Sequence, residues 1–240
     1  PNIEILPNIF HSVLKEEIKN LKMDTLNANI FNNLINNSNW VKRRDFIPIK
    51  AAADYSLLCI LYIILEYFNP EKILELGLGQ TSKLTSQYAQ NKNKKATVQI
   101  IEHDKEWINF FSQQFNTSKN VTVNHLGLET FNYNDSINDK YKNLSDITKN
   151  NKYNLIIIDG PIGGGKKYPR TNIINLIPQN LAEDFIIILD DAQREGETNT
   201  ANLIFDSLNQ NNIKYFSQKR QASKNQLIIA SESCKFATIY

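Results

Sequence analysis

Five short apolar runs, which alternate with segments of helical spacing, constrain the fold of this chain more than any other feature. The runs are rich in Ile and Val and lack polar alternation, which is typical of strands buried on both faces. Strand and helix alternating at this spacing predict a doubly wound α/β fold with a mostly parallel sheet. The predicted strands are Lys72–Leu76, Thr97–Glu102, Val121–Asn124, Tyr153–Asp159 and Asp184–Asp190.

The two ends of the chain depart from this rhythm. At the C-terminus three apolar segments are separated only by turn residues, and at least two of them are expected to pair antiparallel at the edge of a seven-stranded sheet. They are Lys214–Gln218, Gln226–Ser231 and Phe236–Tyr240. The N-terminal part is helix-like, with a loop expected in the Asn-rich stretch Asn27–Asn39. We therefore expect one domain over residues 1–240, with an N-terminal helical cap (1–50) and a Rossmann-like core (51–240).

Helical spacing also places the helices of this arrangement. They are expected at Ile9–Leu21, Asp54–Phe68, Ser82–Gln90, Lys105–Phe115, Thr171–Asn180 and Thr200–Asn209.

Composition narrows the class of protein. Among 240 residues, 27 basic and 25 acidic side chains give a formal net charge of +2, without the basic stripe that nucleic-acid binding requires. Cys59 and Cys234 form no CxxC or Cys/His cluster, which argues against a zinc site or a disulfide framework and fits a reducing cytoplasm. No secretory signal is visible, and the most apolar stretch, Leu57–Leu65, is too short to span a bilayer. We expect a cytoplasmic protein with no membrane span.

A glycine turn after the first predicted strand is the most informative motif. The segment reads Ile73-Leu-Glu-Leu-Gly-Leu-Gly-Gln-Thr-Ser82. Gly77 and Gly79 allow a ligand to approach the backbone closely, and Thr81 or Ser82 can cap the following helix. Glu102 ends the next strand about 25 residues after Gly77, where an acid can accept hydrogen bonds from ribose hydroxyls.

Three interpretations of this turn remain open. A nicotinamide site prefers G-x-G-x-x-G, but Ser82 takes the third glycine position. Glu75, two residues before Gly77, would repel a pyrophosphate and suits the cationic amino-acid end of S-adenosylmethionine. In the third interpretation the glycines only form a tight turn.

The order of four motifs resembles the class I S-adenosylmethionine-dependent methyltransferase family over residues 54–240. The motifs are E-x-G-x-G at Glu75, I-I-E-H-D at Glu102, I-I-I-D-G-P at Asp159 and I-I-L-D-D at Asp190. The resemblance implies that Glu75, Gly77 and Gly79 hold the methionine part and that Glu102 holds the ribose. It makes Thr81 the third small residue of the loop, and Ser82 and Asp159 complete the predicted cofactor set. An adenine-binding acid is not evident in Asn124–Glu129.

The second half of the chain is similar to glucuronoxylan glucuronic-acid O-methyltransferases. The residues that carry this likeness are Ile158–Pro161, Gly163–Gly165, Tyr168, Arg170, Leu189–Glu197 and Glu102–Trp107. Asp190 departs from it, because those enzymes tend to carry His there. The likeness implies methylation of a sugar hydroxyl, for example in a bacterial surface polysaccharide or its precursor.

Three acids are expected to converge where ligands bind an open α/β sheet, beyond the carboxyl ends of the strands. Asp159 ends the fourth strand, and Asp190 and Asp191 end the fifth. Their mutual repulsion calls for a cation, and oxygen ligands suit Mg²⁺, Mn²⁺ or Ca²⁺. Catechol-type and macrolide-sugar O-methyltransferases resemble this layout. Alternatively the acids cap strands or helices, or one acts alone as a base.

Candidate catalytic and acceptor-binding residues follow from these motifs. Asp191 and Asp159 are the first candidates for base or metal ligand, and His103 and His125 are weaker candidate bases. The segment Gly163–Lys167 is either a mobile lid or a solvated loop. An anionic acceptor would suit the residues around it, for which we predict Lys166, Tyr168, Arg170 and Arg194.

The sequence therefore predicts an O-methyltransferase that uses S-adenosylmethionine, with Mg²⁺ or Mn²⁺ as a second candidate cofactor. Its expected partner is a small-molecule or glycan acceptor and not nucleic acid, and homo-oligomer formation is left open. A methyltransferase-fold protein that binds nucleotides without catalysis, and an NAD-dependent oxidoreductase, are the alternatives.

Overall fold

The computed structural model describes residues 5–48 and 52–239, with side chains from residue 11 onward. Its main feature is a seven-stranded sheet in the order β3-β2-β1-β6-β7-β9-β8. All neighbouring strands are parallel except β9, which runs antiparallel to both β7 and β8. The strands are β1 (Lys72–Leu76), β2 (Thr97–Glu102), β3 (Val121–His125), β6 (Tyr153–Ile158), β7 (Leu181–Leu189), β8 (Tyr215–Arg220) and β9 (Gln226–Ser231).

This order confirms the predicted doubly wound sheet with an antiparallel edge. The chain winds outward from β1 in one direction through β2 and β3, and in the other through β6 and β7. The carboxyl ends of β1 and β6 therefore flank the topological switch point, where open α/β sheets bind their ligands.

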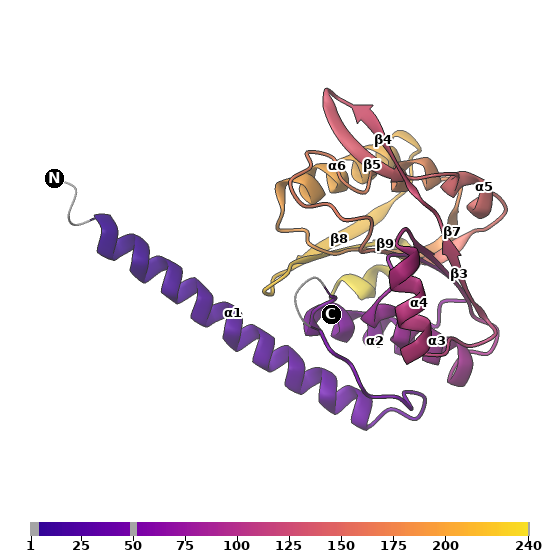
Figure 1. Cartoon of the computed structure of the whole chain (residues 1–240), viewed down its shortest axis with the longest axis horizontal. Helices are drawn as coiled ribbons and strands as arrows, with labels where there is room; N and C mark the ends of the chain where they lie inside the picture. Colours follow the sequence, from indigo (N-terminus) through magenta and orange to yellow (C-terminus); the bar gives the residue numbers. More distant parts are fainter. Residues whose placement is uncertain (1–4, 49–51, 240) are drawn as a thin grey trace.

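Helices cover both faces of the sheet because successive strand residues point to opposite sides. Ile73 belongs to one apolar core and Leu74 to the other. The first core lies under α2 (Tyr55–Tyr67), α3 (Gln80–Asn91), α4 (Lys105–Gln114) and the 3-10 helix η2 (Glu232–Thr238). The second lies under α5 (Leu144–Thr148), the 3-10 helix η1 (Thr171–Leu176) and α6 (Glu195–Gln210) (Figure 1).

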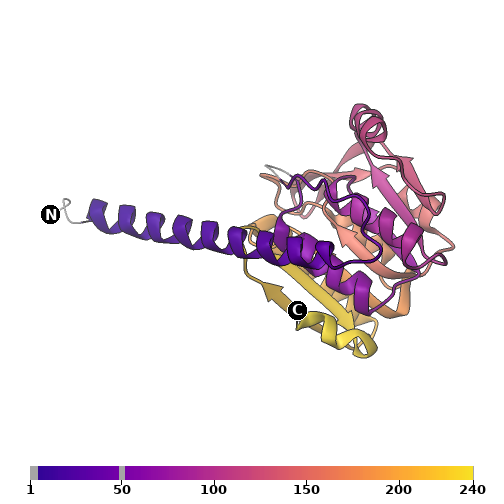
Figure 2. The ribbon, with the colours of Figure 1, turned by 90° about the horizontal axis from the view of Figure 1, so that it is seen from below.

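The N-terminal helix α1 (Ile5–Asn36) corrects one expectation. The predicted loop in Asn27–Asn39 is wrong for most of that stretch, because the helix continues to Asn36. Asn27, Phe31 and Ile35 recur at helical spacing and are buried against the body, so packing offsets the weak helix propensity of asparagine. Only this end of α1 packs on the body, and the rest projects away from it (Figures 1 and 2).

One further helix differs from prediction. The helix expected at Thr171–Asn180 is instead a 3-10 helix that ends at Leu176, because Ile177 precedes Pro178 and adopts an extended conformation. At the C-terminus two of the three apolar segments pair antiparallel as β8 and β9, which confirms the expectation for at least two of them. The third is not a strand: its residues up to Thr238 belong to η2, and Tyr240 lies outside the described residues.

The sequence interpretation missed a hairpin formed by β4 (Leu128–Tyr133) and β5 (Ser136–Tyr141), which projects beyond the sheet (Figure 1). Its turn residues Asn134 and Asp135 both have positive φ, of 46° and 58°. Asn and Asp adopt this conformation more readily than most residues and favour the tight turns of hairpins. The Asn-Asp pair was therefore an available turn signal, although the two strands on either side of it do not alternate regularly between apolar and polar residues.

None of the helices in the described residues is both long enough and apolar enough to cross a membrane.

Candidate nucleoside and carboxylate site

The glycine turn connects β1 to α3 and lies against the end of β6. Gly77 has φ +106°, and a Cβ there would lie 3.3 Å from the Asp159 carbonyl carbon. A Cβ on Gly160 would lie 3.1 Å from the Gly77 Cα. The two glycines thus allow the β1 and β6 ends to touch. Gly79 differs, since a Cβ there would meet no atom within 4 Å. The space beside the first turn of α3 is open.

Glu75 is fully buried beneath this turn. The Ser82 hydroxyl donates to Oε1 (2.8 Å) and the Thr85 hydroxyl to Oε2 (3.0 Å), while Thr81 also donates to Oε1. Burial raises the pKa of Glu75 to about 7, although these hydrogen bonds act against the increase. In this structure Glu75, Thr81 and Ser82 join β1 to α3. Their direct contact with a cofactor stays a prediction.

Glu102, at the end of β2, holds the other side of the turn. Its carboxylate accepts hydrogen bonds from the backbone N–H groups of Leu78 (2.9 Å), His103 (2.6 Å) and Asp104 (2.9 Å). Burial raises the pKa of Glu102, but hydrogen bonds outweigh it, and the net pKa is lowered. Glu102 is therefore an ionised acid at the position where the sequence predicts a ribose contact.

His103 is placed beside Glu102 at the tip of β2. Its Nδ1 lies 2.8 Å from Glu102 Oε1, and the hydrogen bond to Glu102 raises the pKa of His103. His125 Nε2 is in turn 3.0 Å from the His103 carbonyl oxygen. Both histidines thus have structural contacts at the carboxyl ends of β2 and β3, and their role as bases stays a prediction.

Tyr141, at the end of β5, lies beside the glycine turn, and sequence reasoning missed it because it missed the hairpin. Its hydroxyl lies against the switch point, where a Cβ on Gly160 would come within 2.5 Å of it. The ring is buried, and its oxygen is one of the buried polar atoms without a hydrogen-bond partner among the described residues. Burial raises the pKa of Tyr141, so the group is a neutral donor next to the predicted nucleoside site.

The three acids predicted to converge do lie together. Asp159 follows β6, Asp190 and Asp191 follow β7, and one carboxylate oxygen of each lies within 4.8 Å of the others. Burial and the neighbouring Asp190 carboxylate raise the pKa of Asp159. Burial and Asp191 likewise raise the pKa of Asp190. Among the described residues, Asp190 Oδ2 and Asp191 Oδ1 are buried without a hydrogen-bond partner.

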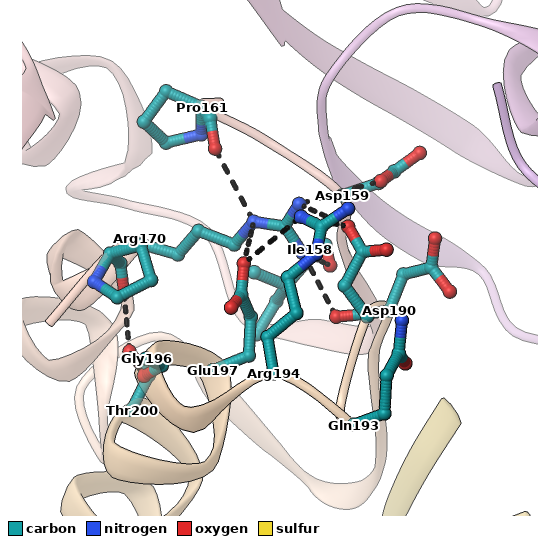
Figure 3. A network of polar contacts seen from close by, with 12 residues as sticks. Ile158, Asp159, Pro161, Arg170, Asp190, Gln193, Arg194, Gly196, Glu197 and Thr200 are labelled. Atoms are coloured by element: carbon teal, nitrogen blue, oxygen red, sulfur yellow. Dashed lines mark hydrogen bonds and ion pairs between the residues drawn. The ribbon is translucent and has the colours of Figure 1, made fainter. Parts of the chain in front are cut away.

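Arg170 lies in the middle of this cluster and is only 2% exposed (Figure 3). Its guanidinium donates to the Asp190 carbonyl oxygen (2.9 Å) and to Asp191 Oδ2 (3.0 Å), and lies 3.7 Å from Asp159 Oδ1. These contacts give Arg170 a structural role in the cluster, and its role in binding an anionic acceptor stays a prediction. The sequence indicated that the acids need a cation, and the chain itself supplies one from the residue before η1.

Comparison with known proteins shows which fold this architecture matches. No protein-family model matches the chain, and no curated protein matches its sequence. Among solved structures, an S-adenosylhomocysteine-bound methyltransferase of Podospora anserina, PaMTH1, superimposes with a TM-score of 0.54 at 11% identity, over 85% of this chain and 88% of that one. The chain has the class I methyltransferase fold.

Two further solved structures agree with this fold. A precorrin-6y C5,15-methyltransferase of Geobacter metallireducens gives a TM-score of 0.51 at 12% identity, over 78% of this chain and 94% of that one. An O-methyltransferase of Bacillus cereus in complex with S-adenosylhomocysteine gives 0.50 at 12% identity, over 72% and 79%. At such identities the likeness establishes the fold alone.

In this methyltransferase fold the segment Gly163–Lys167 packs between the hairpin and α6. Lys166 forms an ion pair with Asp139 of β5. The rings of Tyr168 and of Tyr133 in β4 are in edge-to-face contact, with their centroids 5.2 Å apart. A Cβ on Gly196 would lie 2.3 Å from the Lys166 carbonyl oxygen, so the loop fits closely against the start of α6. Lid motion of this segment stays a prediction.

A pocket opens between the same loop and the N-terminal turn of α6. Lys166, Lys167 and Arg194 contribute to its lining. The Arg194 side chain is 42% exposed, and its Nη1 forms an ion pair with Asp191 Oδ2 at 2.8 Å. Unlike Arg170, it connects the carboxylate cluster to solvent.

Proposed function

We propose that the protein is an S-adenosylmethionine-dependent O-methyltransferase. The observation that supports this most is the open space at Gly79, placed between the ionised Glu102 and the acids that follow β6 and β7. Two solved structures with this fold, from Podospora anserina and Bacillus cereus, contain bound S-adenosylhomocysteine.

In this proposal the chain's own residues bind and orient both reactants. Glu102 accepts hydrogen bonds from the ribose, while Gly77 and Gly79 let the methionine part approach the backbone, which Glu75 holds in place. When bound, S-adenosylmethionine supplies a methyl group on a cationic sulfur. Tyr141, whose hydroxyl is buried without a partner among the described residues, can donate to the nucleoside. Much of the rate acceleration would come from alignment of the acceptor with this methyl group.

A carboxylate next to the acceptor would take the proton of its hydroxyl. Asp159 is the exposed member of the cluster, since its side chain is 20% accessible while that of Asp191 is 4% accessible. Its raised pKa makes it a better proton acceptor than an ordinary aspartate. Asp191, which forms ion pairs with Arg170 and Arg194, would then hold these two guanidinium groups in place or share the proton.

The cluster also fits a divalent cation. Three carboxylate oxygens within 4.8 Å, two buried oxygens without partners among the described residues, and a purely oxygen donor set suit Mg²⁺ or Mn²⁺. Asp159, Asp190 and Asp191 would hold the ion, which when bound lowers the pKa of a coordinated hydroxyl. Arg170 already balances part of the negative charge of these acids, so an ion would balance more of it.

Chelation tests this second cofactor. If the acids hold a catalytic ion, EDTA should reduce turnover at least about tenfold, and Mg²⁺ or Mn²⁺ should restore it. Calorimetry with Mn²⁺ on the wild type and on Asp190→Asn provides the control. Full activity in EDTA together with no Mn²⁺ binding would leave Asp159 acting without an ion.

For the acceptor we propose a hydroxyl of a small molecule or glycan, such as a sugar of a bacterial surface polysaccharide or its precursor. The support is the sequence likeness to glucuronic-acid O-methyltransferases, together with Lys166 and Arg194 at the pocket beside the acids. A carboxylate or phosphate on the acceptor would complement these side chains.

Calorimetric titration with S-adenosylhomocysteine tests the assignment, with NADH as the parallel ligand. We expect saturable binding of S-adenosylhomocysteine and none of NADH. Methyl transfer to a panel of uronic acids and sugar phosphates is then measured with labelled S-adenosylmethionine. Binding of NADH alone would favour the oxidoreductase, binding of S-adenosylhomocysteine without transfer to any acceptor would favour a non-catalytic protein, and binding of neither ligand would overturn the proposal.

A further inference from the structure

The projecting part of α1 carries an apolar stripe that the body of the protein does not cover. Leu14, Ile18 and Leu21 are 40%, 51% and 67% exposed. They recur at alternating spacings of four and three residues, and the pattern continues through Thr25 and Ala28. Such spacing keeps side chains on one face of a helix and is the a/d pattern of a coiled coil.

This stripe is separate from the face of α1 that packs on the body. At 3.6 residues per turn, Asn27, Phe31 and Ile35 form one face, which is buried, and the stripe lies about a quarter turn to its side. A second helix can therefore pack on the stripe without displacing the body. The views of Figures 1 and 2 agree that α1 extends well beyond the body on its N-terminal side.

We infer that the stripe pairs with α1 of a second copy of this chain, in parallel and in register. The apolar residues favour a two-stranded assembly, because Ile18 falls at position a and Leu14 and Leu21 fall at position d. β-branched residues at a with leucine at d are typical of parallel dimers.

The charged residues beside the stripe favour a parallel direction of the two helices. With Ile18 at position a, Lys15 and Lys22 occupy e positions and Glu17 occupies the preceding g position. In a parallel pair each Glu17 faces Lys22 of the other helix, which gives two opposite-charge contacts. In an antiparallel pair g faces g and e faces e, so Glu17 would face an acidic residue and Lys22 a basic one. The parallel arrangement is the one without repulsion.

A lipid surface is a poorer occupant for the same stripe. Helices that lie on anionic membranes carry an excess of Lys and Arg on the polar face. The charged residues of α1 are three lysines and three acids, so the helix has no net charge from them. Membrane binding is therefore an outcome that the test must distinguish, and not the expectation.

The mass of the full chain in solution tests the pairing. Sedimentation equilibrium at about 10–100 µM should give twice the 27.6 kDa of one chain. Leu21→Lys should raise the dissociation constant at least about tenfold, because it places a charge in the seam of both helices. Leu26→Lys is the matched control, since Leu26 is 51% exposed but lies outside the stripe, and it should leave the dimer intact.

A charge exchange tests the direction. Glu17→Lys should weaken the dimer, and the double variant E17K/K22E should restore it. Circular dichroism confirms that each variant remains folded. A wild-type monomer up to about 100 µM, equal effects of Leu21→Lys and Leu26→Lys, tighter association of Glu17→Lys, or co-sedimentation of the monomer with phosphatidylserine vesicles would each overturn the inference.

Discussion

Arg170→Ala is expected to lower the free energy of unfolding by about 3–5 kcal/mol, the cost of removing one partner from a buried ionic cluster. Arg170 is 2% exposed, and its guanidinium lies within 4 Å of carboxylate oxygens of Asp159, Asp191 and Glu197. Without it these acids either remain charged and repel one another or take up protons at a cost. Urea denaturation of the two proteins at pH 7.5 measures the difference.

Arg194→Ala is the matched control for this prediction. Arg194 also contacts Asp191 and Glu197, but its side chain is 42% exposed, so we expect a cost of about 1 kcal/mol or less. The two variants thus separate the buried position from the shared carboxylates. Equal effects of the two substitutions, or an Arg170→Ala protein as stable as the wild type, would show that Arg170 does not compensate the cluster.

The pH dependence of the difference has a definite sign. Burial already raises the pKa of Asp159 and Asp190 in the presence of Arg170, and removing the guanidinium removes an interaction that lowers both values. The variant cluster therefore binds protons more readily than the wild-type cluster. Its deficit in stability should shrink as the pH falls toward the model-peptide range of aspartate and grow as the pH rises.

The parts of the site that depend on local sequence could be predicted. The glycine turn, the acid at the end of β2 and the acids after β6 and β7 follow from strand ends, and strand ends follow from apolar runs. The relative position of Asp159, Asp190 and Asp191 also follows, since parallel strands place their carboxyl ends at one edge of the sheet. The pattern of apolar residues along the sequence was sufficient to predict where these residues lie in the sheet.

The partners of these residues could not be predicted in the same way. Arg170 is on a loop between β6 and η1, and its burial depends on contacts with α6 and β7 that are distant in sequence. The hydroxyls that donate to Glu75 belong to the next helix, so its hydrogen bonds could not be predicted from β1 alone. Tyr141 was missed with its hairpin, whose polar residues give little periodic signal. Long-range pairing therefore decides which charged groups remain available to a ligand.

Gly79→Ala is expected to weaken S-adenosylhomocysteine binding about hundredfold while it lowers the free energy of unfolding by about 1 kcal/mol or less. The added methyl group would meet no protein atom within 4 Å, so the folded chain can accept it. In the proposed complex the same space holds the ligand, which approaches the backbone of the turn closely.

Gly77→Ala should differ by a larger loss of stability. The residue has φ +106° and faces the Asp159 carbonyl group, so alanine there strains the backbone and should cost about 1–3 kcal/mol of stability. Calorimetric titration and urea denaturation of both variants measure the two effects. If Gly79→Ala bound S-adenosylhomocysteine as tightly as the wild type, the nucleoside would have to lie away from the open space at Gly79.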